Sequence, residues 1–285
     1  MRHAQLRAFH NVAVHGGFSR AADAMNLTQP ALSDQVRKLE AEYDVRLFDR
    51  TRKQIAITEA GTRLLEITRR LFEVEDQARD MLSESRSLRD GALRIVSDTP
   101  YHIVDLLAAF RARYPGVQVS VRSGNSAEVA AALNSYEADI GVLGEIPSGT
   151  EYDVIGLSQA PLIAFVSSGS PLAADQTISL RRLSHSPLVL REVGSRTRAK
   201  LQDAFTAARL KPRSFIEAEG REAVREIVAA GGGVGVVSEA EFGTDTRLVK
   251  LPISDANLQM DEALVCLRER RDSRMIRAFM GMAAG

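Results

Sequence analysis

Apolar residues recur at helical spacing in three short segments of the first forty residues, and polar turns separate these segments. The first covers about residues 3–14 and places Leu6 and Phe9 on one face. The second is expected to begin with Ser19 as its N-cap and to end at Asn26, a residue that tolerates the left-handed conformation. Three such helices in close succession predict a helix-turn-helix arrangement.

The third helix is predicted to begin at Thr28, an N-cap residue that stands just before a proline suited to the first helical turn. Leu32, Val36 and Leu39 are spaced to face the core. The opposite face starts with short polar side chains and becomes basic, which suits a helix in the major groove of DNA. The predicted DNA contacts on this helix are Thr28, Gln29, Pro30, Ala31, Ser33, Asp34, Arg37 and Lys38.

A basic turn lies between two short strands that are predicted within residues 45–58. Arg50, Arg52 and Lys53 would form the tip of a wing against the DNA backbone or minor groove. The alternative is a plain three-helix bundle whose basic residues are solvated surface. The local concentration of charge favours the wing, because Lys plus Arg equals Asp plus Glu at 37 each and leaves no global basic field.

A heptad pattern follows, in a helix that we expect from Thr58 to about Ser85. Two sets of apolar residues, three positions apart, each recur every seven residues, as in the seam of a two-stranded coiled coil. The predicted dimerisation residues are Leu64, Ile67, Leu71, Val74, Ala78 and Met81. The alternative is an amphipathic helix packed on its own chain. Dimerisation is favoured because one helix-turn-helix binds a single half-site too weakly.

Strands and helices alternate from Ala92 onward, which predicts an α/β domain with parallel strands. One lobe is expected over about residues 91–161 and 266–285, and a second over about 162–265. The expected fold class is α+β overall, with three parts: an all-α winged helix-turn-helix over 1–58, a dimerisation helix and hinge over 59–90, and a two-lobed α/β sensor over 91–285.

Small polar residues stand where predicted strands of the sensor lead into helices. Free N–H groups and the helix dipole make such termini anion sites, and Arg191 or Arg196 would add a fork for phosphate or carboxylate. The alternative is that each residue only caps its own helix. Three such termini together predict a cleft that binds a small anion, formed by Ser97, Asp98, Thr99, Tyr101, Asn125, Ser126, Arg191, Gly194, Ser195, Arg196 and Thr197.

Five blocks of the N-terminal region resemble the signature of LysR-type transcription regulators in order and spacing. They are Phe18-Ser19-Arg20-Ala21-Ala22, Leu27-Thr28-Gln29-Pro30-Ala31-Leu32-Ser33, Leu39-Glu40, Leu47-Phe48-Asp49-Arg50 and Thr58-Glu59-Ala60-Gly61. The resemblance implies that residues matching Thr28 to Asp34 lie on the recognition helix and that Arg50 belongs to the wing. Many members carry a basic residue at Asp34, so this carboxylate would alter base preference.

The same resemblance implies several partners. LysR-type proteins bind double-stranded promoter DNA, act on RNA polymerase, pair through the long helix and commonly form tetramers. Their sensor domain shares the two-lobed fold of periplasmic solute-binding proteins. We therefore expect a homodimer or homotetramer that regulates transcription.

A narrower resemblance concerns the LysR-type branch associated with 2-aminoethylphosphonate catabolism, and residues 1–10, 100–102, 124–129 and 190–198 carry it. It implies a dianionic phosphonate on the helix termini, with its ammonium group near a carboxylate such as Asp98 or Glu145. The alternative is a regulator of the same type with a different small-molecule effector, or with none.

Other classes of protein fit the sequence less well. The five histidines lack a cysteine or carboxylate at ligand spacing, and no Ser-His-Asp set or P-loop stands out, so we expect no enzyme, no metal site and no cofactor beyond the effector. A free-standing solute-binding protein would need an export signal and would not carry residues 1–60. With no run near the roughly 20 apolar residues of a membrane span, we expect a cytoplasmic protein. The lone Cys266 is predicted to be buried.

Overall fold

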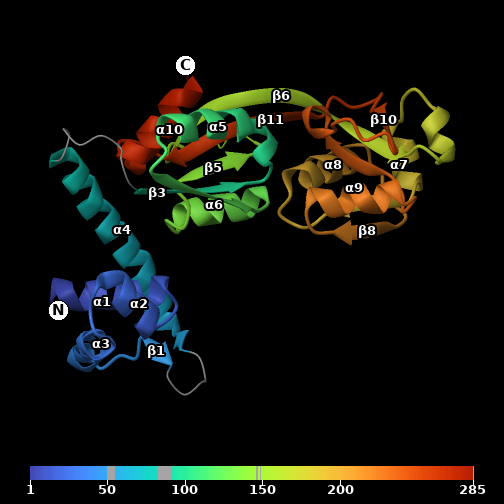
Figure 1. The fold of residues 1–285 in the computed structure, drawn as a ribbon. Helices are drawn as coiled ribbons and strands as arrows, with labels where there is room; N and C mark the ends of the chain where they lie inside the picture. Colours follow the sequence, from blue (N-terminus) through green and yellow to red (C-terminus); the bar gives the residue numbers. More distant parts are fainter. Residues whose placement is uncertain (50–54, 83–90, 146, 148, 285) are drawn as a thin grey trace. The chain divides into compact units, whose positions relative to one another are not determined.

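A computed structural model describes residues 1–285 except 50–54, 83–90, 146, 148 and 285 (Figure 1). The chain forms two compact units, Met1–Ser85 and Arg86–Gly285. No helix in the described part of the chain is both long enough and apolar enough to cross a membrane.

The described part of the first unit contains helices around a small two-stranded hairpin. Its elements are α1 (His3–Val14), α2 (Phe18–Met25), α3 (Gln29–Tyr43), β1 (Phe48–Asp49), β2 (Ala56–Ile57) and α4 (Glu59–Leu82). The two strands pair antiparallel, with Phe48 opposite Ile57. They are the strands of the predicted wing, whose predicted tip (Arg50, Arg52 and Lys53) lies outside the described residues.

The core of this unit agrees with the helical spacing of the sequence. Leu32, Val36 and Leu39 of α3 are buried together with Phe9 of α1. One boundary was wrong, because α2 begins at Phe18, its N-cap is Gly17, and Ser19 lies inside the helix. The Phe18 ring is buried and packs against Phe48, so the N-cap lies two residues earlier than predicted and the ring is placed in the core.

The second unit has two lobes. Lobe I contains β3 (Gly91–Ser97), η1 (Pro100–Ile103), α5 (Val104–Arg113), β4 (Val117–Ser123), α6 (Ser126–Asn134), β5 (Ile140–Leu143), η4 (Arg268–Arg270) and α10 (Arg274–Ala284). Lobe II contains η2 (Pro171–Ala174), α7 (Leu180–His185), β7 (Leu188–Arg191), α8 (Arg196–Ala207), β8 (Phe215–Ala218), α9 (Arg221–Ala229), β9 (Gly235–Ser238), η3 (Glu239–Glu241) and β10 (Leu248–Pro252).

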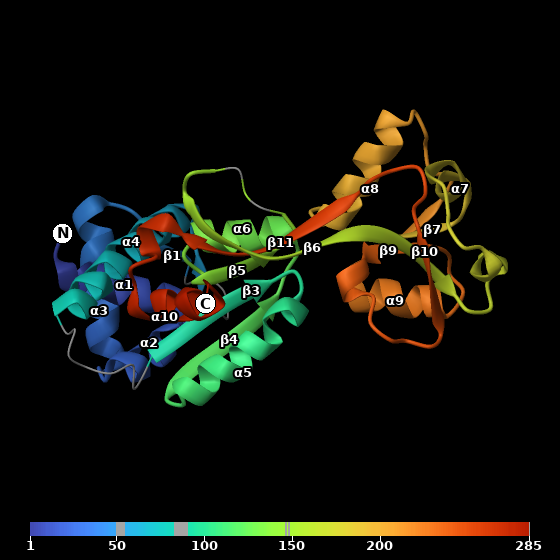
Figure 2. The same cartoon turned by 90° about the horizontal axis from the view of Figure 1, so that it is seen from above.

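Two long strands, β6 (Tyr152–Ser167) and β11 (Gln259–Leu267), run side by side from one lobe to the other (Figures 1 and 2). They belong to a seven-stranded sheet of order β10-β6-β11-β5-β3-β4, in which β9 also pairs with β6. The expected break between lobes at residue 162 falls inside β6. These two strands connect the lobes.

The expectation of parallel strands holds only in part. β3 pairs parallel with β4 and β5, and β7 pairs parallel with β8, whereas every pair that includes β6 or β11 is antiparallel. The physical reason is that β11 returns along β6 in the opposite direction. Antiparallel neighbours need no crossover helix, and the alternation of strands and helices in the sequence does not reveal them.

The first helical segment of the second unit, which follows Ser97-Asp98-Thr99, is divided. A 3₁₀ turn, η1, comes first, and Ile103 then leaves the helical conformation (φ −122°, ψ 6°) before α5 begins. The Ser97-Asp98-Thr99 segment therefore leads into a short 3₁₀ turn rather than the predicted α-helix N-terminus. Cys266 is fully buried as expected, and burial raises the pKa of its thiol to about 12, which keeps it protonated.

Candidate functional site

The predicted DNA-contacting residues form the N-terminal and outward surface of α3. The Thr28 hydroxyl accepts a hydrogen bond from the Ala31 N–H (3.4 Å) and so acts as the predicted N-cap. Gln29, Pro30 and Ala31 are exposed, as are Arg37 and Lys38 further along the helix, while Ser33 and Asp34 are half-buried. A helix with short polar residues at its exposed start can approach base edges closely.

Asp34 and Lys38 interact on this surface. The Lys38 Nζ lies 2.7 Å from Asp34 Oδ2, and this hydrogen bond lowers the pKa of the Asp34 carboxyl. The two side chains are 61% and 45% exposed, so the pair contributes little to stability and can exchange for a contact with DNA. It holds Lys38 beside Asp34, where the carboxylate offsets the lysine charge.

The wing strand is attached to α3 by one carboxylate. Glu40 Oε1 accepts hydrogen bonds from the Leu47 N–H (2.9 Å) and the Phe48 N–H (3.2 Å). The start of α4 packs closely on the same segment, because a Cβ atom at Gly61 would lie 2.3 Å from the Leu47 carbonyl oxygen. The recognition helix and the wing strands are thus fixed to each other by hydrogen bonds and a close backbone contact.

An exposed apolar stripe runs along α4. Ile67, Leu71 and Val74 are 57%, 41% and 62% exposed, and Ala78 is exposed as well. Leu64, which was predicted in the same seam, is half-buried and packs on the core of its own unit, as does the buried Phe72 of another face. The Met81 side chain lies outside the described part of the structure. The two alternatives therefore divide between faces of the helix: Leu64 and Phe72 pack on the same unit, whereas Ile67, Leu71 and Val74 are exposed.

The N-terminus of α8 carries the buried hydroxyls predicted to bind an anion. Ser195 and Thr197 are 2% and 4% exposed. Ser195 stands at the N-cap position, but its side chain makes no capping hydrogen bond, and its hydroxyl has no partner among the described residues. Gly194 has φ +97°, a conformation that favours glycine, and a Cβ there would lie 2.8 Å from Asn125 Oδ1. The chain thus leaves donors at this terminus unused.

The N-terminus of α6 differs from this. The Asn125 side chain accepts hydrogen bonds from the Ala127 and Glu128 N–H groups (3.1 Å each), and the Glu128 carboxylate accepts one from the Asn125 N–H (2.8 Å). This is the capping box that the sequence indicated. The N–H groups that could bind an anion already donate to the Asn125 and Glu128 side chains. Asn125 therefore caps its own helix, as the capping alternative expected.

Asp98 connects lobe I with lobe II. Its carboxylate accepts hydrogen bonds from the Ser126 hydroxyl (3.2 Å) and from Arg191 Nη2 of lobe II (3.2 Å). Arg191 also donates twice to Glu192 (2.8 and 2.9 Å), whose Oε2 accepts the Gly220 N–H. Burial opposes ionisation of both partners, yet the pairing lowers the pKa of Glu192 to about 2 and raises that of Arg191.

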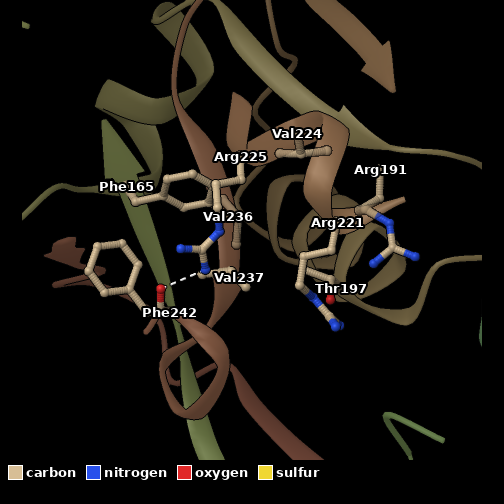
Figure 3. Close-up of a pocket in the computed structure, with 9 residues that line it drawn as sticks. All are labelled: Phe165, Arg191, Thr197, Arg221, Val224, Arg225, Val236, Val237 and Phe242. Atoms are coloured by element: carbon tan, nitrogen blue, oxygen red, sulfur yellow. Dashed lines mark hydrogen bonds between the residues drawn. The ribbon is translucent and has the colours of Figure 1, made fainter. Parts of the chain in front are cut away.

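Three guanidinium groups and one hydroxyl line a pocket in lobe II (Figure 3). Arg191 and Thr197 were predicted, whereas Arg221 and Arg225 of α9 were missed; the other lining residues are Phe165, Val224, Val236, Val237 and Phe242. The pocket has a volume of about 10 Å³, room for about one water molecule. α9 follows β8 as α8 follows β7, so the strand-to-helix rule applied to the first could have identified the second.

The remaining predicted residues lie in different environments. Arg196 forms an ion pair with Glu145 of lobe I. Ser97 is fully buried, with a hydroxyl that has no partner among the described residues. Thr99 is buried, and its hydroxyl has no partner among the described residues. Tyr101 is 62% exposed, so the structure does not bring it into the buried network.

Two family models together match nearly the whole chain. Residues 3–62 match the model described as "Bacterial regulatory helix-turn-helix protein, lysR family", and residues 86–285 match "LysR substrate binding domain".

Named relatives are similar over most of their length. The chain is 32% identical to the HTH-type transcriptional activator CmpR of Synechocystis sp., over 97% of this chain and 92% of that protein. It is 33% identical to the RuBisCO operon transcriptional regulator of Allochromatium vinosum, over 96% and 93%. Among solved structures, the Synechocystis PCC6803 CcmR regulatory domain in complex with 2-PG is 25% identical with a TM-score of 0.62, over 68% of this chain and 97% of that one.

Proposed function

Because this chain belongs to the LysR family of bacterial helix-turn-helix regulators, we propose that a small anionic metabolite, bound between the two lobes of its sensor domain, switches its action on DNA. The chain is a DNA-binding transcription regulator with an effector-binding domain, and its matched families and relatives are regulators rather than enzymes. Promoter DNA and further copies of the same chain are its partners. Because its target is DNA, we propose that it acts in the cytoplasm.

The observation that carries the effector proposal is the N-terminus of α8. Its buried Ser195 hydroxyl has no partner among the described residues, and Thr197 lines the same pocket as Arg191, Arg221 and Arg225. Free amides at a helix N-terminus, buried hydroxyls and guanidinium groups are the donors that bind phosphate or carboxylate. The lobe II pocket as it stands admits about one water, so an effector bound between the lobes would have to displace inter-lobe contacts beside it, such as that of Arg191 with Asp98.

The charges of the cleft favour an effector that also carries a positive group. Arg191 and Arg196 of lobe II pair with Asp98 and Glu145 of lobe I. An anion that takes over these arginines removes the ion-pair partner of Glu145 and leaves Asp98 with the Ser126 hydroxyl and the more distant Arg221, so an ammonium group on the same molecule would bind one of these carboxylates. A zwitterion such as 2-aminoethylphosphonate meets both requirements.

The comparisons favour a broader range of effectors. The CcmR regulatory domain was solved with 2-PG, and one relative is named for the RuBisCO operon. The phosphonate resemblance is not confirmed by these relatives. We therefore keep 2-aminoethylphosphonate as one candidate and 2-PG as the second, with the small anion as the chemistry they share.

The proposed mechanism is a shift between two populated states. Paired sensor domains hold the DNA-binding units at one spacing, and an effector that binds one state of the cleft more tightly changes that spacing. The bend of the bound DNA changes with it, and the interaction with RNA polymerase follows.

The first test is a gel shift with the full-length protein on its own upstream intergenic DNA, with 2-aminoethylphosphonate, 2-PG, ethylphosphonate or no addition. Thr197→Val should retain the DNA complex and lose the response, while Thr206→Val, an exposed position on the same helix, should retain both. A response to 2-aminoethylphosphonate but not to ethylphosphonate supports the zwitterion. A complex that responds to none of these anions, together with no thermal shift, would exclude the proposed effector class.

We propose that α3 reads bases through its exposed start and contacts phosphates further along. Gln29→Ala or Ser33→Ala should weaken binding to the operator more than to unrelated DNA. Arg37→Ala should weaken both equally and reduce the dependence of binding on salt. Arg50→Ala and Arg52→Ala should act like Arg37→Ala. An equal loss on both DNAs for Gln29→Ala would contradict the assignment of that residue to base reading.

We also propose that the exposed stripe of α4 pairs two chains. Val74→Asp places a charge in this seam and should convert the dimer to a monomer in sedimentation experiments, whereas Thr62→Asp, on the opposite face, should not. An unchanged sedimentation coefficient for Val74→Asp would place the dimer interface elsewhere.

A further inference from the structure

A histidine and two glutamates lie together where the two lobes join. His102 Nε2 is 3.4 Å from Glu241 Oε1 and 4.0 Å from Glu262 Oε1. Ligand atoms of all three side chains lie within 4.8 Å of one another. The residues come from η1 of lobe I, η3 of lobe II and the connecting strand β11.

All three side chains are buried: those of His102, Glu241 and Glu262 are 5%, 1% and 2% exposed. Glu262 Oε2 has no hydrogen-bond partner among the described residues, although the carboxylate is directed into the cluster. A buried carboxylate in this position is stabilised only when a positive charge or a proton joins it.

The charges around the cluster do not cancel. The guanidinium groups of Arg191 and Arg221 pair with three carboxylates there, those of Asp98, Glu192 and Glu241, and Glu262 adds a fourth. When all four carboxyl groups are ionised, four negative charges against two positive charges leave two in excess, which is the charge of one divalent cation.

Neighbouring side chains orient His102 and Glu241, in the way that hydrogen-bonding residues around a metal site orient its ligands. His102 Nδ1 lies 3.3 Å from the Ser158 hydroxyl. When Nδ1–H donates to this hydroxyl, Nε2 presents its lone pair to the two carboxylates, an arrangement that needs a cation between them. Arg221 Nη2 lies 2.9 Å from Glu241 Oε2 and leaves Oε1 of that carboxylate to face the histidine.

We propose that His102, Glu241 and Glu262 bind one divalent transition-metal ion of the Zn²⁺ type. One imidazole and two carboxylates are ligands that such ions accept, with water in a fourth position. Ligands at about 2.0–2.2 Å in a tetrahedral site stand about 3.4 Å apart, close to the shorter separation observed here. The ion would join both lobes and the connecting strand, and so restrict their relative movement independently of the effector.

The test uses full-length protein treated with a chelator and then titrated with ZnCl₂ by calorimetry. We expect one Zn²⁺ per chain and a rise in unfolding temperature with added Zn²⁺, because an ion that binds the folded state stabilises it. Co²⁺ should give the visible absorption of a nitrogen- and oxygen-ligated site. Loss of a ligand in His102→Gln or Glu262→Gln should weaken Zn²⁺ binding by about tenfold or more.

Two controls keep this test decisive. His185→Gln removes an exposed histidine of lobe II and should leave Zn²⁺ binding unchanged. Glu262→Gln removes a buried charge, so without metal it should be at least as stable as the original chain, and lost binding cannot then be ascribed to misfolding. Saturable binding lost in both cluster variants supports the site. No saturable binding, or binding that persists in both variants, overturns it.

Discussion

Two helix N-termini meet in the sensor cleft, and they use their donors differently. At α6, Asn125 and Glu128 complete a reciprocal cap. At α8, Ser195 occupies the same position but makes no cap, and its buried hydroxyl is without a partner in the described structure. One terminus is stabilised by its own side chains, whereas the other keeps a buried hydroxyl without a partner in the described structure. A polar residue at an N-cap position therefore does not by itself distinguish a cap from a candidate ligand site, and its hydrogen bonds must be known as well.

The largest expected effect comes from Arg191, the lobe II side chain that binds Asp98 of lobe I beside these termini. Arg191→Met leaves the Asp98 and Glu192 carboxylates without their buried partner, and should lower the free energy of unfolding by about 3–5 kcal/mol. Urea denaturation of the sensor signal measures it. Arg196→Met, which breaks a half-exposed pair with Glu145, should cost about 0–1 kcal/mol. Equal losses in the two variants would contradict the linking role of Arg191.

Acid should lower the free energy of unfolding by protonating Glu192, the carboxylate that pairs with Arg191. Its pKa falls from 4.5 to about 2 in the folded chain, because Arg191 and the Gly220 N–H bind the carboxylate against the opposing effect of burial. A depressed pKa stabilises the fold above the unfolded value, and this stability is lost as pH falls from about 4.5 towards 2. The contribution is at most about 3 kcal/mol. Glu192→Gln should flatten stability over this pH range, as followed by urea denaturation at each pH; an unchanged slope would contradict the assignment.

The cap of α6 should have a moderate effect. Asn125→Ala removes the acceptor of the Ala127 and Glu128 N–H groups and should lower the free energy of unfolding by about 1 kcal/mol. Asn125→Asp, which retains an acceptor, should restore most of the loss in the same measurement. A neutral Asn125→Ala would mean that water replaces the cap without cost.

The sequence predicted whatever depends on local spacing. The buried face of α3, the Thr28 cap, the wing strands and the Asn125–Glu128 box all follow from residues within a few positions of one another. What it missed depends on distant contacts. His102 meets Glu241 and Glu262 only because β6 and β11 join the lobes, so no ligand spacing along the chain indicates them.

Two other gaps have equally physical causes. The sequence does not reveal that β6 is continuous through both lobes. The first part of the strand is mainly half-buried and a fully buried run follows, and such a change of pattern is typical of two separate elements. Arg221 and Arg225 were not predicted as pocket residues, because a sequence pattern assigns an arginine in a helix to the solvated surface and only the fold shows that these two line a pocket. For the same reason, the heptad of α4 did not distinguish Leu64, which packs on its own unit, from the exposed Ile67 and Val74.

Ser195→Ala at the α8 terminus should give the smallest change in the free energy of unfolding, and its sign should be opposite to that of Asn125→Ala at the α6 terminus. Ser195→Ala removes a buried hydroxyl without a partner in the described structure, so it should leave the free energy of unfolding unchanged or raise it by up to about 1 kcal/mol. In the same protein the affinity for the effector should fall, because a donor to the anion is lost. Denaturation in the absence of ligand and calorimetry with the effector found in the gel shift measure the two quantities. A variant that is destabilised as much as Asn125→Ala and still binds the effector normally would make Ser195 an ordinary cap, and the two termini would then be alike.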